Sequence, residues 1–206
     1  MDSKHDILNT LRRDPVPDTG LPALDGPWLT FEQPLDQFRE VLAAVGGQSL
    51  VAAHEGDLPH ALAQLPSFRA AQRVWSLVPP VASVGRDWTT VTDPHELEVL
   101  DYCVAPGALG VAENAAVWIA HPTVPHRAAL FLAQHLVLVV PGRSLVHTMH
   151  EAYARIPPGQ TSFGLFISGP SKTADIEQAL VIGAHGPRSL TVVLTGTDFP
   201  ASRFSP

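Results

Sequence analysis

Short apolar runs alternate along the chain with segments in which apolar residues recur at helical spacing. The apolar runs at 49–53, 74–78, 135–140 and 189–195 have the length and composition of buried strands. Residues 34–47, 58–65 and 144–156 are predicted helices. The first of them aligns Phe38, Val41, Leu42 and Val45 on one stripe and stops at Gly46-Gly47. This alternation predicts an α/β fold, with a mainly parallel sheet flanked by helices.

The pattern changes between residues 101 and 121, where two or three short strands are expected. Tight turns are predicted at Pro106-Gly107 and at Glu113-Asn114. Residues 127–133 are expected to form one or two helical turns. This region therefore interrupts the regular succession of strands and helices.

The N-terminal 33 residues differ in character from the rest of the chain. A short helix is predicted over 3–13, with Ile7, Leu8 and Leu11 on one face. The proline-rich segment that follows, 14–27, is predicted to be an extended connector. We therefore expect an N-terminal arm over 1–33 and a single α/β domain over 34–206. The arm is expected to pack either on the body or on a second subunit of a homodimer.

Residues 161–187 form the stretch around which the rest of the chain is expected to be organised. A strand is predicted to end at Ile167, because Ser168-Gly169-Pro170 cannot continue it. A helix is then predicted from Ser171, with Asp175 in its first turn, where the helix dipole favours a carboxylate. Gly183 is expected to end this helix before the strand 189–195.

The loop between that strand and helix is the predicted ligand site. Ligands of open parallel sheets bind at the carboxyl ends of the strands. Ser171, Thr173 and the free amides of a helix start can hold a carboxylate or a phosphate. The alternative is that both hydroxyl groups only cap the helix.

A nucleotide phosphate loop is excluded at this position. Gly164 and Gly169 have the required spacing, but Pro170-Ser171 displace Lys172 from its place after the second glycine. Pro170 also removes one of the backbone donors that such a loop needs.

Composition restricts the function further. The chain has 206 residues, 45% hydrophobic and 16% charged, with a net charge of -7, which argues against binding to nucleic acid. Cys103 is the only cysteine, so this chain alone forms no disulfide and ligates no iron–sulfur cluster. We also expect no membrane span, no signal peptide and a cytoplasmic location.

The remaining polar residues of interest have competing interpretations. His147, His150 and Glu151 fit none of the helical zinc patterns, and His121, His126 and His135 match no standard spacing, so no metal site is expected. His185 lies in a tight connection after the predicted helix, at the end of the sheet away from the ligand loop, and a structural role is expected for it. Glu113 is either a nucleophile or general base, or a turn residue in water.

The amino-acid sequence of residues 167–187 also resembles that of a known family. SGPSKTADIE, followed by GAHGP and an apolar strand, is similar to the LUD-domain family, the lactate utilisation protein C group. The resemblance covers roughly residues 35–197 of this chain. GVAENAAVWI aligns with a family segment that usually reads Ala-Glu-Thr-Gly-Thr, so Glu113 is kept, whereas Asn114, Ala115 and Ala116 depart from it.

This resemblance implies a fold like that of sugar-phosphate isomerases and CoA-transferases. It also implies participation in the oxidation of L-lactate to pyruvate beside iron–sulfur partner proteins, with no cofactor held by this chain. The ligand-binding residues expected from the loop and the resemblance together are Ser168, Gly169, Ser171, Lys172, Thr173 and Asp175. The residues expected to have structural roles are Glu177, Gly183, His185 and Gly186.

Two hypotheses follow for the function. The first is a cofactor-free component of a multi-protein L-lactate oxidation system, whose crevice at 168–175, with Glu113 opposite, binds a small organic anion or a partner loop. The second is a stand-alone acyl- or CoA-transferase-like enzyme with Glu113 as the nucleophile. A covalent thioester on Glu113 after incubation with acyl-CoA would distinguish the second from the first.

Overall fold

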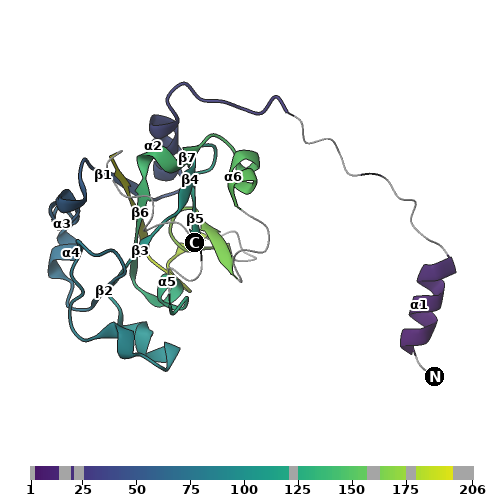
Figure 1. Ribbon diagram of the computed structural model, residues 1–206. Coiled ribbons are helices and arrows are strands. Elements are labelled where there is room, and N and C mark those ends of the chain that lie inside the picture. Colours follow the sequence, from purple (N-terminus) through teal and green to yellow (C-terminus); the bar gives the residue numbers. More distant parts are fainter. Residues whose placement is uncertain are drawn as a thin grey trace.

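The body of the protein is built on a five-stranded parallel sheet. The computed structural model describes residues 3–13, 20, 26–120, 125–156, 163–174 and 180–196 (Figure 1). The strand order is β1-β11-β6-β3-β2, and all four neighbouring pairs are parallel. The strands are β1 Gln48–Ala52, β2 Val74–Ser76, β3 Tyr102–Pro106, β6 His135–Pro141 and β11 Ser189–Thr195. The predicted α/β class with a mainly parallel sheet is confirmed.

Both faces of this main sheet are buried. Along β6, Leu136, Leu138 and Val140 belong to one hydrophobic cluster, and Val137 and Val139 belong to the cluster on the opposite face. Successive side chains of a strand point to opposite faces, so a strand buried on both sides must be apolar throughout. This requirement explains why the central strands appear in the sequence as unbroken apolar runs.

Helices cover one face of the main sheet, and helices together with a second sheet cover the other (Figure 1). The α-helices are α1 Ser3–Arg13, α2 Pro34–Ala44, α3 Leu58–Ala63, α4 Pro66–Ala70, α5 Ala129–Leu132 and α6 Met149–Arg155. The 3-10 helices are η1 Glu55–Asp57, η2 Trp88–Thr90, η3 Pro94–Val99 and η4 Gly142–Ser144. Leu58 and Leu62 of α3 pack on the first face, and Phe38 and Leu42 of α2 pack on the second.

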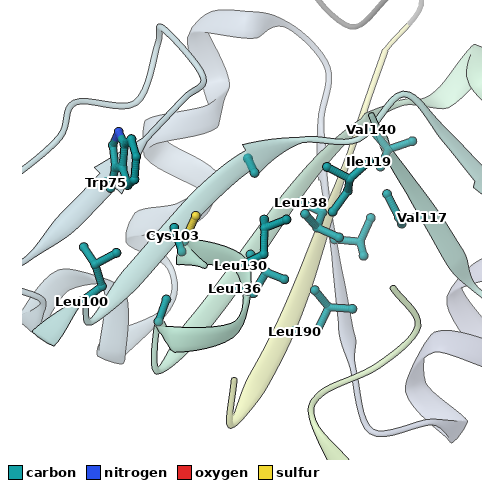
Figure 2. Close-up of a cluster of buried hydrophobic side chains, with 14 of the residues drawn as sticks. Trp75, Leu100, Cys103, Val117, Ile119, Leu130, Leu136, Leu138, Val140 and Leu190 are labelled. Atoms are coloured by element: carbon teal, nitrogen blue, oxygen red, sulfur yellow. The ribbon is translucent and has the colours of Figure 1, made fainter. Parts of the chain in front are cut away.

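The second sheet is smaller and has the order β7-β4-β5-β8. Its strands are β4 Leu109–Val111, β5 Ala116–Ala120, β7 Leu145–Val146 and β8 Gly164–Ile167. β5 runs antiparallel to both β4 and β8, and β4 runs parallel to β7. Figure 2 shows Val117 and Ile119 of β5 close to Leu138 and Val140 of the main sheet, so the two sheets share one core.

Two predictions about the 161–187 stretch are wrong. Its first strand, β8, is an edge of the second sheet and not a strand of the parallel sheet. The helix expected after Ser171 is also absent from the described residues on either side of the 175–179 gap. In its place β9 Lys172–Ala174 pairs antiparallel with β10 Leu180–Ile182, with Thr173 opposite Val181. Pairing between the two arms satisfies backbone groups that a helix would have satisfied locally.

The helix predicted at 144–156 is shorter than expected. α6 begins only at Met149, after η4 and the short strand β7. Thr148 precedes it as the N-cap, and its hydroxyl accepts a hydrogen bond from the Glu151 N–H. Ala152 of α6 is buried, with Met149 and Ile156 packed against the same cluster.

The single cysteine lies in the centre of the core (Figure 2). Cys103 is fully buried on β3, and burial raises the pKa of its thiol to about 12. Of the helices in the described ranges, not one has the length and apolarity that crossing a bilayer demands.

Candidate functional site

The loop after β8 is held against the end of α2. Gly169 has a φ of +73°, and a β-carbon there would lie 2.8 Å from the carbonyl oxygen of Val45. A β-carbon on Gly46 would in turn lie 3.6 Å from Pro170 Cγ and 4.0 Å from Lys172 Cε. The Ser-Gly-Pro turn therefore requires glycine for both its backbone angle and its close approach to α2.

Two backbone hydrogen bonds join this loop to the turn that precedes β11. The Ser171 N–H donates to the Pro187 carbonyl at 2.9 Å, and the Gly183 N–H donates to the Ser171 carbonyl, also at 2.9 Å. A β-carbon on Gly186 would lie 3.0 Å from both Cβ and Oγ of Ser171, and 3.7 Å from the Phe131 carbonyl oxygen. The glycine at 186 thus allows the turn to pack directly on the Ser171 side chain.

A cavity of about 280 Å³ lies between the loop, the turn and α5. Its polar side chains are Ser171, Lys172 and His185. The remaining lining is backbone or apolar: Leu130, Phe131, Leu136, Ile167, Gly169, Pro170, Gly186, Pro187 and Leu190. Leu130, Leu136 and Leu190 belong to the shared core shown in Figure 2. A volume of this order lies at the small end of the range for ligand pockets.

The chemistry of this cavity favours a small anion with an apolar part. Lys172 supplies a positive charge on an exposed side chain, and the half-buried Ser171 supplies a hydroxyl donor. The imidazole of His185 adds a donor or acceptor at the same opening. Charge-assisted hydrogen bonds to carboxylates or phosphates are stronger than neutral ones. The leucines and Ile167 provide a surface for a short alkyl group.

The position of the cavity in the fold differs from the prediction. Leu136 and Leu190 are the second residues of β6 and β11, so the cavity lies at the amino ends of the parallel strands. The carboxyl-end rule does not apply, because the loop follows a strand of the second sheet. His185, expected at the end of the sheet away from the ligand loop, instead lines the same cavity as Ser171.

Five of the residues singled out from the sequence are brought together here, and others are not. Gly169, Ser171, Lys172, His185 and Gly186 line the cavity. Thr173 lies on β9, and Gly183 turns the chain after β10 with a φ of +73°. Asp175 and Glu177 lie outside the described residues. The alternative, that Ser171 and Thr173 only cap a helix, is wrong, because Ser171 directly precedes β9 and Thr173 lies on that strand.

Glu113 lies in the turn between β4 and β5. One carboxylate oxygen, Oε1, accepts a hydrogen bond from the Met149 N–H at 2.6 Å, and the Glu113 N–H donates to the His147 carbonyl at 3.1 Å. The half-buried carboxylate therefore satisfies an amide at the start of α6, where the helix dipole favours a negative charge. Glu113 does not line the cavity of Ser171 and Lys172. Its role as a nucleophile stays a prediction.

Ser168 connects the Glu113 turn to the cavity loop. Its Oγ donates a hydrogen bond to the Asn114 carbonyl at 2.7 Å, one residue from Gly169. The next residue of the turn, Ala115, is buried and has a φ of +53°. Glycine is the residue that adopts this backbone angle without cost. Ala115 is therefore a non-glycine residue held in the left-handed region of backbone angles.

The apolar lining of the cavity was not predicted from the sequence. Leu130 and Phe131 come from α5, and Leu136 and Leu190 come from two strands of the main sheet. Their spacing in the chain carries no signal that they meet. In the described part of the chain, no group of three or more His, Cys, Asp or Glu side chains is arranged to hold a metal ion.

Comparison with known proteins places these features in one family. The LUD domain profile matches residues 95–195, which include the Glu113 turn, the loop after β8 and the turn before β11. "Lactate utilization protein C" of Anoxybacillus flavithermus is 30% identical over 162 residues, which cover 77% of this chain and 68% of that protein. The proteins of the same name from Geobacillus kaustophilus and Deinococcus radiodurans are 26% and 27% identical, and the alignments cover 79% and 96% of their lengths and 93% and 95% of this chain.

A solved structure has a similar fold. The crystal structure of a DUF162 family protein from Deinococcus radiodurans superposes with a TM-score of 0.58 at 21% sequence identity. The superposition covers 82% of this chain and 100% of that one. This likeness supports the α/β architecture.

Proposed function

The chain belongs to the LUD domain family, with the proteins named lactate utilization protein C, and on this premise we propose that it serves in lactate utilisation. The proposed role is that of a cytoplasmic component in the oxidation of L-lactate to pyruvate. Its partners would be the iron–sulfur subunits of that system. The cysteine content supports this division of labour, because a cysteine-ligated cluster needs several thiolates and Cys103 is a single buried thiol.

The ligand of this component would be a small organic carboxylate such as L-lactate or pyruvate. The observation that carries this proposal is the grouping of Ser171, Lys172 and His185 around a small apolar cavity. The carboxylate would lie near the Lys172 ammonium and the Ser171 hydroxyl, and the methyl group would face Leu136 and Leu190. A carboxylate at one end and a methyl group at the other are what a short 2-hydroxy or 2-oxo acid offers.

Calorimetric titration with L-lactate and pyruvate tests this site. The variant Lys172→Met keeps the length of the aliphatic side chain and removes the charge, so binding should weaken by about 10- to 100-fold. The chain has only one other lysine, Lys4, which lies on α1, so Lys4→Met is the matched control and should bind like the wild type. Equal binding by all three proteins would contradict the assignment of Lys172. No binding of either acid would contradict the ligand class.

Growth tests the pathway separately from the ligand. A strain lacking this protein should fail to grow on L-lactate as sole carbon source, and the wild-type copy should restore growth. Lys172→Met should restore it poorly, whereas Lys4→Met should restore it fully. Normal growth of the deletion strain would argue against an essential role in L-lactate use, whatever the cavity binds.

A further inference from the structure

The N-terminal helix α1 has an apolar face with no buried residue. Ile7, Leu8 and Leu11 share this face and are 60%, 40% and 64% exposed. Figure 1 shows α1 standing apart from the body. A helix of 11 residues is only marginally stable in water by itself, and most helices of this kind are stabilised by packing. We therefore expect the apolar face of α1 to pack against another surface.

A groove with an aromatic lining that suits this apolar face lies between α6 and Trp28. Trp28 stacks on His150, with ring centroids 3.5 Å apart and an angle of 9° between the planes. Tyr153, one turn further along α6, is 63% exposed. Trp28, His150, Glu151, Tyr153 and Ala154 enclose a hollow of about 550 Å³. An aromatic groove of this kind takes the aliphatic face of an amphipathic helix.

Charge also favours the pairing of this helix with the body. α1 carries three cationic side chains, Lys4, Arg12 and Arg13, against one carboxylate, Asp6. The whole chain has a net charge of -7, so the part outside α1 is more acidic than the whole. Glu151 places a carboxylate among the groove residues. Attraction between a basic arm and an acidic body steers the two together.

The connection between α1 and the groove indicates which body the helix reaches. Trp28, a wall of the groove, follows almost directly after the proline-rich connector, which holds Pro15, Pro17 and Pro22. The sequence predicts this connector to be extended, with a reach of roughly 3 Å per residue. A helix carried outward from the groove of its own body is placed to meet the groove of a neighbour. Two such contacts close a two-fold dimer, because each copy offers one arm and one groove.

We propose that α1 of one copy docks in the Trp28–Tyr153 groove of a second copy, and that the second copy returns the contact. This inference is independent of the cavity around Ser171. It assigns a binding partner to α1 and to the groove at the same time.

Sedimentation or light scattering of the full chain tests the exchange of arms. The wild type should be a dimer, and Leu11→Asp should raise the dissociation constant about tenfold or more, because it places a charge on the face of α1 that the groove would cover. Asn9→Asp adds the same charge on the opposite face of α1 and should leave the dimer intact. Tyr153→Ala, on the groove, should weaken the dimer as Leu11→Asp does. Leu11 and Tyr153 are both exposed, so circular dichroism should show an unchanged fold in either variant.

A mixing experiment separates this arrangement from other dimers. In a mixture of Leu11→Asp and Tyr153→Ala, the intact arm of the second protein meets the intact groove of the first, so dimers should form again in part. A dimer that loses stability with Leu11→Asp but not with Tyr153→Ala would mean that the arms pair with each other. A monomeric wild type, or one whose arm binds anionic vesicles instead, would also overturn the proposal.

Discussion

The five-stranded main sheet and the four-stranded second sheet differ in burial, regularity and contribution to the site. The main sheet has seven-residue strands at its centre, β6 and β11, and its cores lie on both faces. The second sheet is built from strands of two to five residues, and its outer cluster includes the partly buried Trp118 and Phe166. The cavity lies where the two meet, with Leu136 and Leu190 from one and Ile167 from the other. The main sheet thus carries most of the buried core, whereas the polar groups of the cavity come from the loop after β8, from β9 and from the turn before β11.

The largest expected difference between the main and the second sheet is in the free energy of unfolding lost on substitution of a core residue. Leu138 is fully buried in β6, so Leu138→Ala should lower the free energy of unfolding by about 3 kcal/mol through lost burial and a residual cavity. Leu165→Ala, on the half-buried edge strand β8, should cost about 1 to 2 kcal/mol. Chemical denaturation measures both. Equal losses would mean that the second sheet contributes to stability as strongly as the main one.

The next largest loss of stability is expected from a substitution in the turn between β4 and β5. Ala115→Val places a β-branched residue at a φ of +53° in a buried position, and should cost about 2 kcal/mol or more. Ala115→Gly should change stability by less than about 1 kcal/mol, because relief of backbone strain offsets the lost methyl group and the greater freedom of the unfolded chain. Thermal unfolding compares the two. A strongly destabilised glycine variant would show that the methyl contact matters more than the backbone angle.

A smaller effect on stability, with a larger effect on binding, is expected from Gly186→Ala. The new methyl group would lie 3.0 Å from Ser171 Oγ, while backbone hydrogen bonds hold Ser171 in place. Stability should fall by about 1 kcal/mol, as in mild overpacking, and carboxylate binding should be lost. Gly56→Ala is the control, since a β-carbon there meets nothing within 4 Å. Wild-type binding by Gly186→Ala would argue that the ligand does not use this wall.

The smallest expected effect is a change of stability with pH at His135. Burial lowers the pKa of His135, and nearby Arg188 lowers it further, although Asp101 acts in the opposite direction. Because the unfolded chain takes up the proton first, this contribution is complete above the ordinary histidine pKa of about 6.5 and is lost as the pH falls towards the lower folded-state pKa.

Denaturation at pH 7 and pH 5 should therefore show a smaller loss of stability in His135→Gln than in the wild type. Glutamine can keep the hydrogen bond that the histidine Nδ1 shares with Ser189 Oγ. His60→Gln, at an exposed position of α3, should behave like the wild type. An unchanged pH dependence in His135→Gln would show that other groups dominate it.

The same contrast between the sheets explains what the sequence allowed us to predict. The strands 135–141 and 189–195 and the helix 34–44 were predicted nearly to the residue, because burial on two faces or on one helical stripe leaves a periodic pattern. β8 has an equally apolar run, but the sequence of its four residues does not indicate which sheet the strand joins. The helix expected after Ser171 failed because Ile182 and Thr173 favour strands as well, and the partner that decides lies in the opposite arm of the hairpin.

The candidate site was predictable only in part, for a related reason. The Ser-Gly-Pro-Ser-Lys sequence located the polar loop, but the turn at Gly186-Pro187 was expected at the opposite end of the sheet, and only the structure shows that it faces the loop. The apolar wall came from Leu130, Leu136 and Leu190, which are brought together only by the packing of α5 on the main sheet. Polar loops leave a local signature, whereas a cavity floor depends on tertiary packing.

The depth of Cys103 has a practical consequence. A fully buried thiol with a pKa near 12 is almost entirely protonated and shielded at neutral pH, so maleimide reagents should leave the folded protein unmodified. The native chain therefore behaves as a cysteine-free background for site-specific labelling. A single cysteine introduced on α1, with a spin label or a fluorophore attached, would report the position of α1 in solution without any other change to the sequence.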